Sequence, residues 1–289
     1  MNTSGSDTSL RGRDVQRRFD RAATDFDDAD FVHSVTRDGL LERLEPIQLE
    51  AHTVVDLGCG TGSACPLLSR RFRRSRVIAI DLSANMLRKL KDKQSWRSKT
   101  AAVQADARAL PLADNSVDVI FANLLLPWID DPAGLFGEVA RVLRKDGLMI
   151  FATLGPDSLL ELRRAWQSVD QGMHVNPSLD MHDIGDAAVR AGLRDPVLDV
   201  DRLAVTYAST AALFRDLTAT GARNSLRKRS RSLVGRRRFI AMTDALEAEG
   251  SAGAIRLDLE LVYGHCWGSG AGGRAGEYRI DAGQIGRRT

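Results

Sequence analysis

The chain has 289 residues with 41 basic and 38 acidic side chains, and its net charge of +3 is too small to indicate a polyanionic partner. Its three cysteines form no Cys-x-x-Cys pair, so we predict neither a disulfide framework nor a metal site. No apolar run approaches the ~20 residues of a membrane span, and the polar N-terminus lacks the apolar segment of a secretory signal. These features predict a cytoplasmic protein without a membrane segment.

The N-terminal region is predicted to contain a disordered tail over residues 1–12 and a helical segment over 13–50, where apolar residues recur at near-helical spacing. Strand-like and helix-like segments then alternate, which is typical of βαβ units in a parallel sheet that binds ligands at its carboxyl edge. Strands are predicted at 53–57, 76–80, 101–104, 117–122 and 147–153, and helices at 62–72, 83–93 and 132–144. Asp146-Gly147 is the expected turn before the fifth strand.

Two more strands are expected at 197–206 and 255–264, and about fifty residues separate them. We predict that this insertion, residues 207–253, forms a helical cap. The sheet-containing domain would then cover residues 51–267, and the glycine-rich segment 268–289 would be loosely ordered.

A glycine-rich turn follows the first predicted strand and indicates a nucleoside cofactor. Asp56 lies near the end of the strand, and Gly58, Gly60 and Gly62 follow, so the backbone can turn tightly and let a ligand approach. The next predicted strand ends in Asp81, where this architecture holds a ribose through its two hydroxyls.

Glycine spacing separates two cofactor classes. A dinucleotide fingerprint needs a glycine where this chain has Ser63, whereas the observed Asp-x-Gly-x-Gly-x-Gly resembles the first motif of class I methyltransferases, which bind S-adenosylmethionine. In that superfamily an acid after the third strand accepts the adenine amino group, and Asp106 stands there. Trp128, after the fourth strand, either walls the methyl-transfer site or packs in the core.

A basic segment spans residues 223–238, where eight of sixteen residues are basic and none is acidic. Because the net charge of the whole chain is +3, the remaining residues have a net charge of −5. It is either a solvated helix face, a nucleic-acid patch or a docking site for an acidic protein. Its position in the cap favours the protein partner, and the lack of interleaved aromatic residues apart from Phe239 argues against nucleic acid. The docking residues would be Arg223, Arg227, Lys228, Arg229, Arg231, Arg236, Arg237 and Arg238.

Over residues 15–267 the chain resembles the malonyl-[acyl-carrier protein] O-methyltransferase family of biotin synthesis. The glycine turn is common to the superfamily, and the segments after residue 150 are the specific ones. The resemblance is carried by Phe19-Asp20-Arg21-Ala22-Ala23, Asn123-Leu124 with Trp128, Thr153-Leu154-Gly155-Pro156-Asp157-Ser158-Leu159 with Glu161-Leu162-Arg163, His174-Val175-Asn176, Met181-His182-Asp183-Ile184-Gly185-Asp186, and Tyr263-Gly264-His265 with Trp267.

The resemblance implies a Rossmann-like α/β fold with a seven-stranded, mostly parallel sheet whose last strand is antiparallel, and an N-terminal helical lid. It implies methylation of the free malonyl carboxylate on acyl carrier protein, without a general base because that carboxylate is already ionised near neutral pH. The implied cofactor site comprises Asp56, Gly58, Gly60, Gly62, Asp81, Leu82, Met86, Asp106, Ala107, Asn123 and Leu124.

Four residues are candidates for the substrate pocket. Arg21 and His174 are alternative cations for the malonyl carboxylate, although either would equally suit a structural ion pair. Phe26 stands where the family usually has Tyr, and Trp128 is the candidate residue for lining the methyl-transfer site. Two further departures are Pro127, where the family commonly has Gln, and Cys266, where it has a small residue.

Three other functions stay open at this stage. The first is methylation of a small metabolite without a carrier protein. The second is the role of a mitochondrial complex I assembly factor linked to arginine hydroxylation, which shares much of this pattern, although Asp7 and Asp14 argue against a mitochondrial presequence. The third is nucleic-acid binding through the basic segment, which would weaken steeply with salt.

Overall fold

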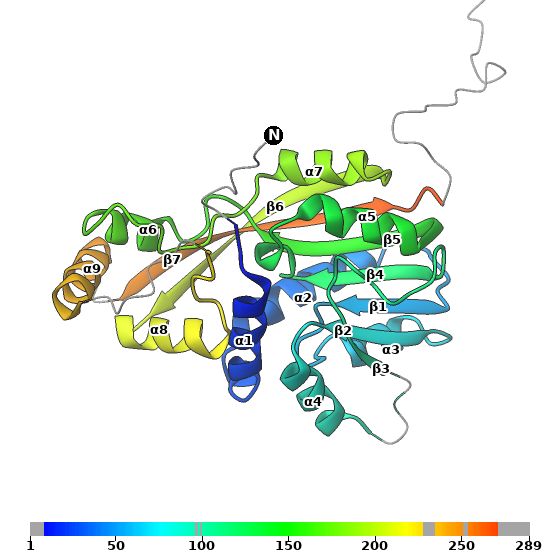
Figure 1. The fold of residues 1–289 in the computed structure, drawn as a ribbon, viewed down its shortest axis with the longest axis horizontal. Coiled ribbons are helices and arrows are strands. Elements are labelled where there is room, and N and C mark those ends of the chain that lie inside the picture. The colour runs from blue at the N-terminus through cyan, green and yellow to red at the C-terminus, as the bar shows by residue number, and fades with distance from the viewer. Residues whose placement is uncertain (1–8, 96–97, 99, 228–234, 251–253, 271–289) are drawn as a thin grey trace, which may run out of the picture.

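The computed structural model describes residues 9–95, 98, 100–227, 235–250 and 254–270. Its centre is a seven-stranded sheet in the order β3-β2-β1-β4-β5-β7-β6 (Figure 1). Neighbouring strands from β3 to β5 are parallel, and β7 is antiparallel to both β5 and β6. The predicted class I methyltransferase fold is therefore confirmed. The strands are β1 (Thr53–Leu57), β2 (Arg76–Asp81), β3 (Ala101–Gln104), β4 (Val117–Asn123), β5 (Leu143–Leu154), β6 (Arg194–Tyr207) and β7 (Ile255–Trp267).

Helices cover both faces of the sheet because side chains alternate along each strand. In β1, Val54 and Val55 are fully buried in different hydrophobic clusters. The Val54 cluster includes residues of α2 (Phe31–Leu44), α3 (Cys65–Arg71) and α4 (Ala84–Lys93). The Val55 cluster includes residues of α5 (Pro132–Val142) and α7 (Met181–Arg190). Such double coverage leaves the carboxyl edge of the strands for a ligand.

The N-terminal helix α1 (Gly12–Ala22) lies at that edge and is tied to the start of α4. Asp20 Oδ1 accepts hydrogen bonds from Ser83 Oγ at 2.6 Å and from the backbone N–H of Asn85 at 3.2 Å. A 3-10 turn, η1 (Phe26–Asp28), connects α1 to α2. The helical segment predicted before the sheet is thus two helices, of which the first lies against the ligand-binding edge.

The predicted disordered tail is too long at its C-terminal end. Leu10 is only 6% exposed and forms an isolated β-bridge with Leu226, and α1 already begins at Gly12. This pairing buries two leucines together with Val15, which favours an ordered segment. The first eight residues of that predicted tail, and residues 271–289 of the predicted C-terminal tail, lie outside the described residues.

A cap of three helices packs at one end of the molecule (Figure 1). The predicted insertion contributes α8 (Thr210–Ala219) and α9 (Arg236–Glu249), whereas α6 (Leu160–Gln167) precedes β6 and was not predicted. Trp166 of α6, Leu213 of α8 and Met242 of α9 share one buried cluster. The cap is therefore assembled from two stretches of chain.

The predicted boundary between α5 and β5 is wrong by several residues. The helix ends at Val142 and the strand begins at Leu143, because Leu143 already pairs with Val117 of β4. Arg144, which was predicted to end the helix, lies in the strand with its Nη1 2.6 Å from Asp118 Oδ1. Likewise α3 begins at Cys65 rather than residue 62, because the glycine turn continues that far.

No helix among the described residues has the length and apolar character needed to span a bilayer.

Candidate functional site

A cavity of about 90 Å³ opens where β1, β2 and β4 end. Such an edge is where open α/β sheets bind their ligands. Eight of the eleven predicted cofactor residues line it: Gly58, Gly60, Asp81, Leu82, Asp106, Ala107, Asn123 and Leu124.

The glycine turn is held in shape by Asp81. Its Oδ2 accepts a hydrogen bond from the Gly60 N–H at 2.9 Å, and its Oδ1 accepts one from the Ser83 N–H at 2.8 Å. Gly58 and Gly60 have φ values of 73° and 53°, in the left-handed region that favours glycine. Burial raises the pKa of Asp81. Each Asp81 oxygen keeps a second lone pair, so the carboxylate can still accept from a ribose hydroxyl.

Three predicted cofactor residues do not line the cavity. Asp56 is 2% exposed beneath the turn, where Cys65 Sγ donates to its Oδ2 at 3.2 Å, and burial raises the pKa of Asp56 to about 7. Met86 is fully buried under the N-terminal helices. Gly62 has a φ of 80°, and a Cβ there would lie 2.5 Å from Leu90 Cδ1. The third glycine is therefore needed for packing against α4 rather than for contact with a ligand.

Asp106 is already engaged by a neighbouring cation. Arg108 Nε donates to Asp106 Oδ1 at 3.0 Å, and Arg108 Nη2 donates to Oδ2 at 2.8 Å. This guanidinium lowers the pKa of Asp106. The carboxylate is thus ionised and fixed in place, with lone pairs left for one further donor such as an adenine amino group.

His33, which is not among the predicted site residues, reaches the cavity from α2. Its Nδ1 is buried without a hydrogen-bond partner among the described residues, and so is Asn123 Oδ1. Burial lowers the pKa of His33 to about 4, so its imidazole is neutral near pH 7. Two unpaired buried polar atoms beside a glycine turn fit a ligand that carries its own polar groups, such as the amino-acid tail of S-adenosylmethionine. The only sequence signal was a polar residue within an apolar helical pattern.

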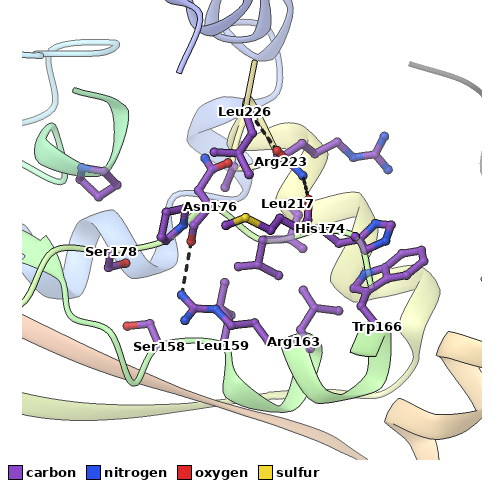
Figure 2. Close-up of a pocket in the computed structure, with 18 of the residues that line it drawn as sticks. Ser158, Leu159, Arg163, Trp166, His174, Asn176, Ser178, Leu217, Arg223 and Leu226 are labelled. Carbon is purple, nitrogen blue, oxygen red and sulfur yellow. Dashed lines mark hydrogen bonds between the residues drawn. The ribbon is translucent and has the colours of Figure 1, made fainter. Parts of the chain in front are cut away.

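A second, larger cavity of about 860 Å³ lies between the sheet edge and the cap, and we call it the acceptor pocket (Figure 2). Trp128, at the end of the 3-10 turn η2 (Leu126–Trp128), lines both this pocket and the cofactor cavity. Among the described residues, the lining contains four arginines and a single carboxylate, Asp170. The pocket is therefore suited to an anionic ligand that meets the cofactor at Trp128.

The other substrate candidates have different positions. Phe26 is buried in the cofactor cavity, with its ring centroid 4.9 Å from that of His33. His174 lines the acceptor pocket, stacked on Trp166 at 3.8 Å, with its Nε2 2.7 Å from Asp170 Oδ1. Arg21 is exposed and lines neither cavity. The prediction that Arg21 contacts the substrate does not fit this structure, because its helix turns that side chain toward the outer surface.

The predicted docking arginines gather partly at the pocket. Arg223 and Arg238 are exposed and line the acceptor pocket, and Arg227, Arg236 and Arg237 are exposed nearby in sequence. Lys228, Arg229 and Arg231 lie outside the described residues.

Comparison with known proteins decides the family. The malonyl-[acyl-carrier protein] O-methyltransferases of Laribacter hongkongensis and Methylovorus sp. are each 41% identical to this chain, with 88% of both chains covered. The corresponding enzyme of Halorhodospira halophila is 38% identical over 98% of both chains. This chain belongs to that family. A methyltransferase domain family also matches residues 55–151, which hold the glycine turn and the cofactor cavity strands.

Solved structures support the fold. The YcgJ protein of Bacillus subtilis superposes with a TM-score of 0.58 at 16% identity, and covers 79% of this chain and 97% of its own. A putative methyltransferase from Haloferax volcanii, solved with its Trm112 activator, gives a TM-score of 0.56 at 20% identity and covers 92% of this chain. At these identities the likeness concerns the fold alone.

Proposed function

We propose that this protein transfers a methyl group from S-adenosylmethionine to the free carboxylate of a malonyl thioester carried by acyl carrier protein. The observation that carries the proposal is a cationic acceptor pocket that meets the cofactor cavity at Trp128. The substrate named for the family's other members supports the same acceptor. The product would be a malonyl methyl ester, the form that enters biotin synthesis.

The cofactor would be held by residues of the smaller cavity. Asp81 would accept from the ribose hydroxyls, Asp106 from the adenine, and Asn123 Oδ1 from the ammonium group of the amino-acid tail. When bound, S-adenosylmethionine supplies an electrophilic methyl group on sulfur. Phe26 and Trp128 would exclude water from the transfer site, which raises the reactivity of the acceptor carboxylate.

The reaction needs no general base. A malonyl carboxyl group titrates near ~4, so it is ionised at neutral pH. One of its oxygens forms the new bond to the methyl carbon as the carbon–sulfur bond breaks, and no proton moves. The neutral imidazole of His33 agrees with this chemistry, because it contributes shape and a hydrogen bond rather than a charge. Catalysis would then consist of alignment and desolvation.

The carrier protein would dock at the mouth of the acceptor pocket. Acyl carrier proteins of this pathway are acidic, and the exposed side chains of Arg223 and Arg238 lie at the pocket. Complementary charge steers such an encounter and sets its register. We include a cytoplasmic location in this proposal, supported by three buried cysteines that are all free thiols.

The test is to incubate the protein with methyl-labelled S-adenosylmethionine and malonyl-carrier protein. We expect label on the carrier protein that is released by mild base, as for a methyl ester. Acetyl-carrier protein, which has no free carboxylate, is the control acceptor. Labelling of a small metabolite with none on the carrier protein would reject the proposal in favour of a carrier-independent methyltransferase.

A further inference from the structure

Arg163 is an arginine of the acceptor pocket whose guanidinium lacks a carboxylate partner among the described residues. It extends from α6 toward Asn176 on the opposite wall (Figure 2). Its Nη1 donates to the Pro156 carbonyl oxygen at 3.2 Å, and its Nη2 donates to the Asn176 carbonyl oxygen at 3.3 Å. Its Nε is buried with no hydrogen-bond partner in the part of the chain that the structure describes. Two long bonds to neutral acceptors orient the group without neutralising its charge.

The Arg163 guanidinium is partly removed from water, which disfavours its charged form. Burial lowers its pKa, and no carboxylate among the described residues raises it. By contrast, the pKa of Arg108 is raised by Asp106, and the pKa of Arg43 is raised by Asp199 despite partial burial. A half-buried cation without a counter-ion is unfavourable unless a bound anion completes the site.

The other charged groups of the pocket are poorly placed for the same role. Arg18 Nη2 donates to the Asn224 carbonyl oxygen at 2.5 Å, and Arg223 and Arg238 are exposed at the mouth. The one lining carboxylate, Asp170, already accepts from the backbone N–H of Gly172 at 2.8 Å and bonds to His174. Arg18 is partly buried as well, but among the described lining residues only Arg163 has a buried guanidinium nitrogen without a hydrogen-bond partner, so an entering anion would complete its contacts.

We propose that Arg163 binds the free carboxylate of the acyl acceptor and thereby selects acyl groups that end in a carboxylate. This inference rests on the proposed function and assigns to Arg163 the role that the sequence suggested for Arg21 or His174. A guanidinium presents its donors in a planar fork that matches the two oxygens of a carboxylate. The bond would hold the acceptor in one orientation while leaving an oxygen lone pair for the methyl group.

The experiment compares equilibrium binding of malonyl- and acetyl-carrier protein to the wild type and to Arg163→Met. Both ligands carry the same phosphopantetheine, so only the carboxylate differs. We expect the wild type to prefer the malonyl form by about 30-fold or more, and Arg163→Met to lose most of that preference while its affinity for the acetyl form is unchanged. Arg163→Lys should keep part of it, because a point charge remains.

Arg164→Met is the matched control, since Arg164 is exposed on the same helix outside the pocket lining and should leave the preference intact. A preference that persists in Arg163→Met would overturn the inference. Equal weakening of both ligands would also overturn it, because that result indicates a phosphate contact or a structural role. If Arg163→Met does not fold, the Lys variant decides: an undiminished preference there rejects a bidentate contact. Failure of the wild type to form a base-labile ester would instead reject the proposed function.

Discussion

Phe19 and Trp128 pack edge to face, with ring centroids 5.0 Å apart, where the N-terminal helix meets the turn after β4. Phe19 lines the cofactor cavity, whereas Trp128 lines that cavity and the acceptor pocket. The contact therefore connects helix α1 at the cofactor cavity to the Trp128 side chain, which lines both cavities. The two rings have different neighbours, so their removal should have different kinetic consequences.

We expect Phe19→Ala to weaken S-adenosylmethionine binding by about tenfold, because the variant loses a large apolar contact of the cofactor cavity. Trp128→Ala should instead lower the turnover number by about 10- to 100-fold, because a gap between the two ligands disturbs their alignment. Calorimetric titration and initial rates at saturating cofactor separate the two effects. Equal effects of both variants on cofactor affinity and turnover would contradict this division.

Asp81→Ala should reduce S-adenosylmethionine affinity by at least about 100-fold while the chain stays folded. The variant loses both the predicted ribose acceptor and the bond that shapes the turn at Gly60. Asp92→Ala, on the exposed surface of α4, is the control and should bind normally. Unchanged affinity in the Asp81 variant, measured by titration and accompanied by a normal melting curve, would exclude the assigned ribose contact.

Much of this cofactor site could be predicted from the sequence because its determinants are local. The turn, the strand ends and Asp81 follow one another within about thirty residues, and each has its own composition signal. Gly62 shows the limit of such reasoning. A glycine needed for cofactor approach and one needed for helix packing look alike in a motif, and only the position of Leu90 distinguishes them.

The acceptor pocket could not be predicted in the same way. Its walls come from α1, η2, the 170–178 loop and the three cap helices, and which side chains face inward depends on how these segments pack. Arg163 belongs to a segment that carried the family resemblance, but its burial and missing counter-ion are properties of the assembled fold. Arg21 was one of two candidate cations on sequence position alone, and the structure shows that its side chain is exposed on α1.

Gly62→Ala should destabilise the protein rather than impair cofactor contact directly. A left-handed alanine costs about 1–2 kcal/mol, and the clash with Leu90 adds to it. Gly137→Ala, in α5 with no atom within 4 Å of the new Cβ, should raise the free energy of unfolding by up to about 1 kcal/mol. Urea denaturation measures both changes. A Gly62 variant of normal stability that fails to bind S-adenosylmethionine would show that our packing assignment is wrong.

The buried carboxyl of Asp56 makes stability depend on pH. Folding raises its pKa from 3.8 to about 7, so between these values the folded state binds a proton that the unfolded state does not. The free energy of unfolding should therefore fall as the pH rises through this window. Asp56→Asn cannot ionise, and it should be more stable than the wild type by up to about 4 kcal/mol at about pH 8 and by less than half of that at about pH 5.

Denaturant unfolding of the cofactor-free protein at both pH values measures this difference, with Asp92→Asn as the exposed control. A stability gain that is the same at both pH values would mean that ionisation of Asp56 is not its cause.

Charge reversal at Arg236 and Arg237 tests the docking surface without touching the acceptor pocket, since both side chains are exposed and neither lines it. For the double variant to Glu we expect the KM for malonyl-carrier protein to rise by about tenfold at low ionic strength, because an acidic partner would be repelled rather than steered. The difference should shrink at about 0.5 M salt, where exposed charges are screened. The double variant Arg70→Glu/Arg73→Glu, at two exposed positions in and just after α3, makes the same change in net charge and is the control. Turnover of malonyl-coenzyme A, which lacks the protein, should not change.

An equal loss with both acceptors would place the defect in the active site, and an unchanged KM for the carrier protein would remove Arg236 and Arg237 from the docking surface.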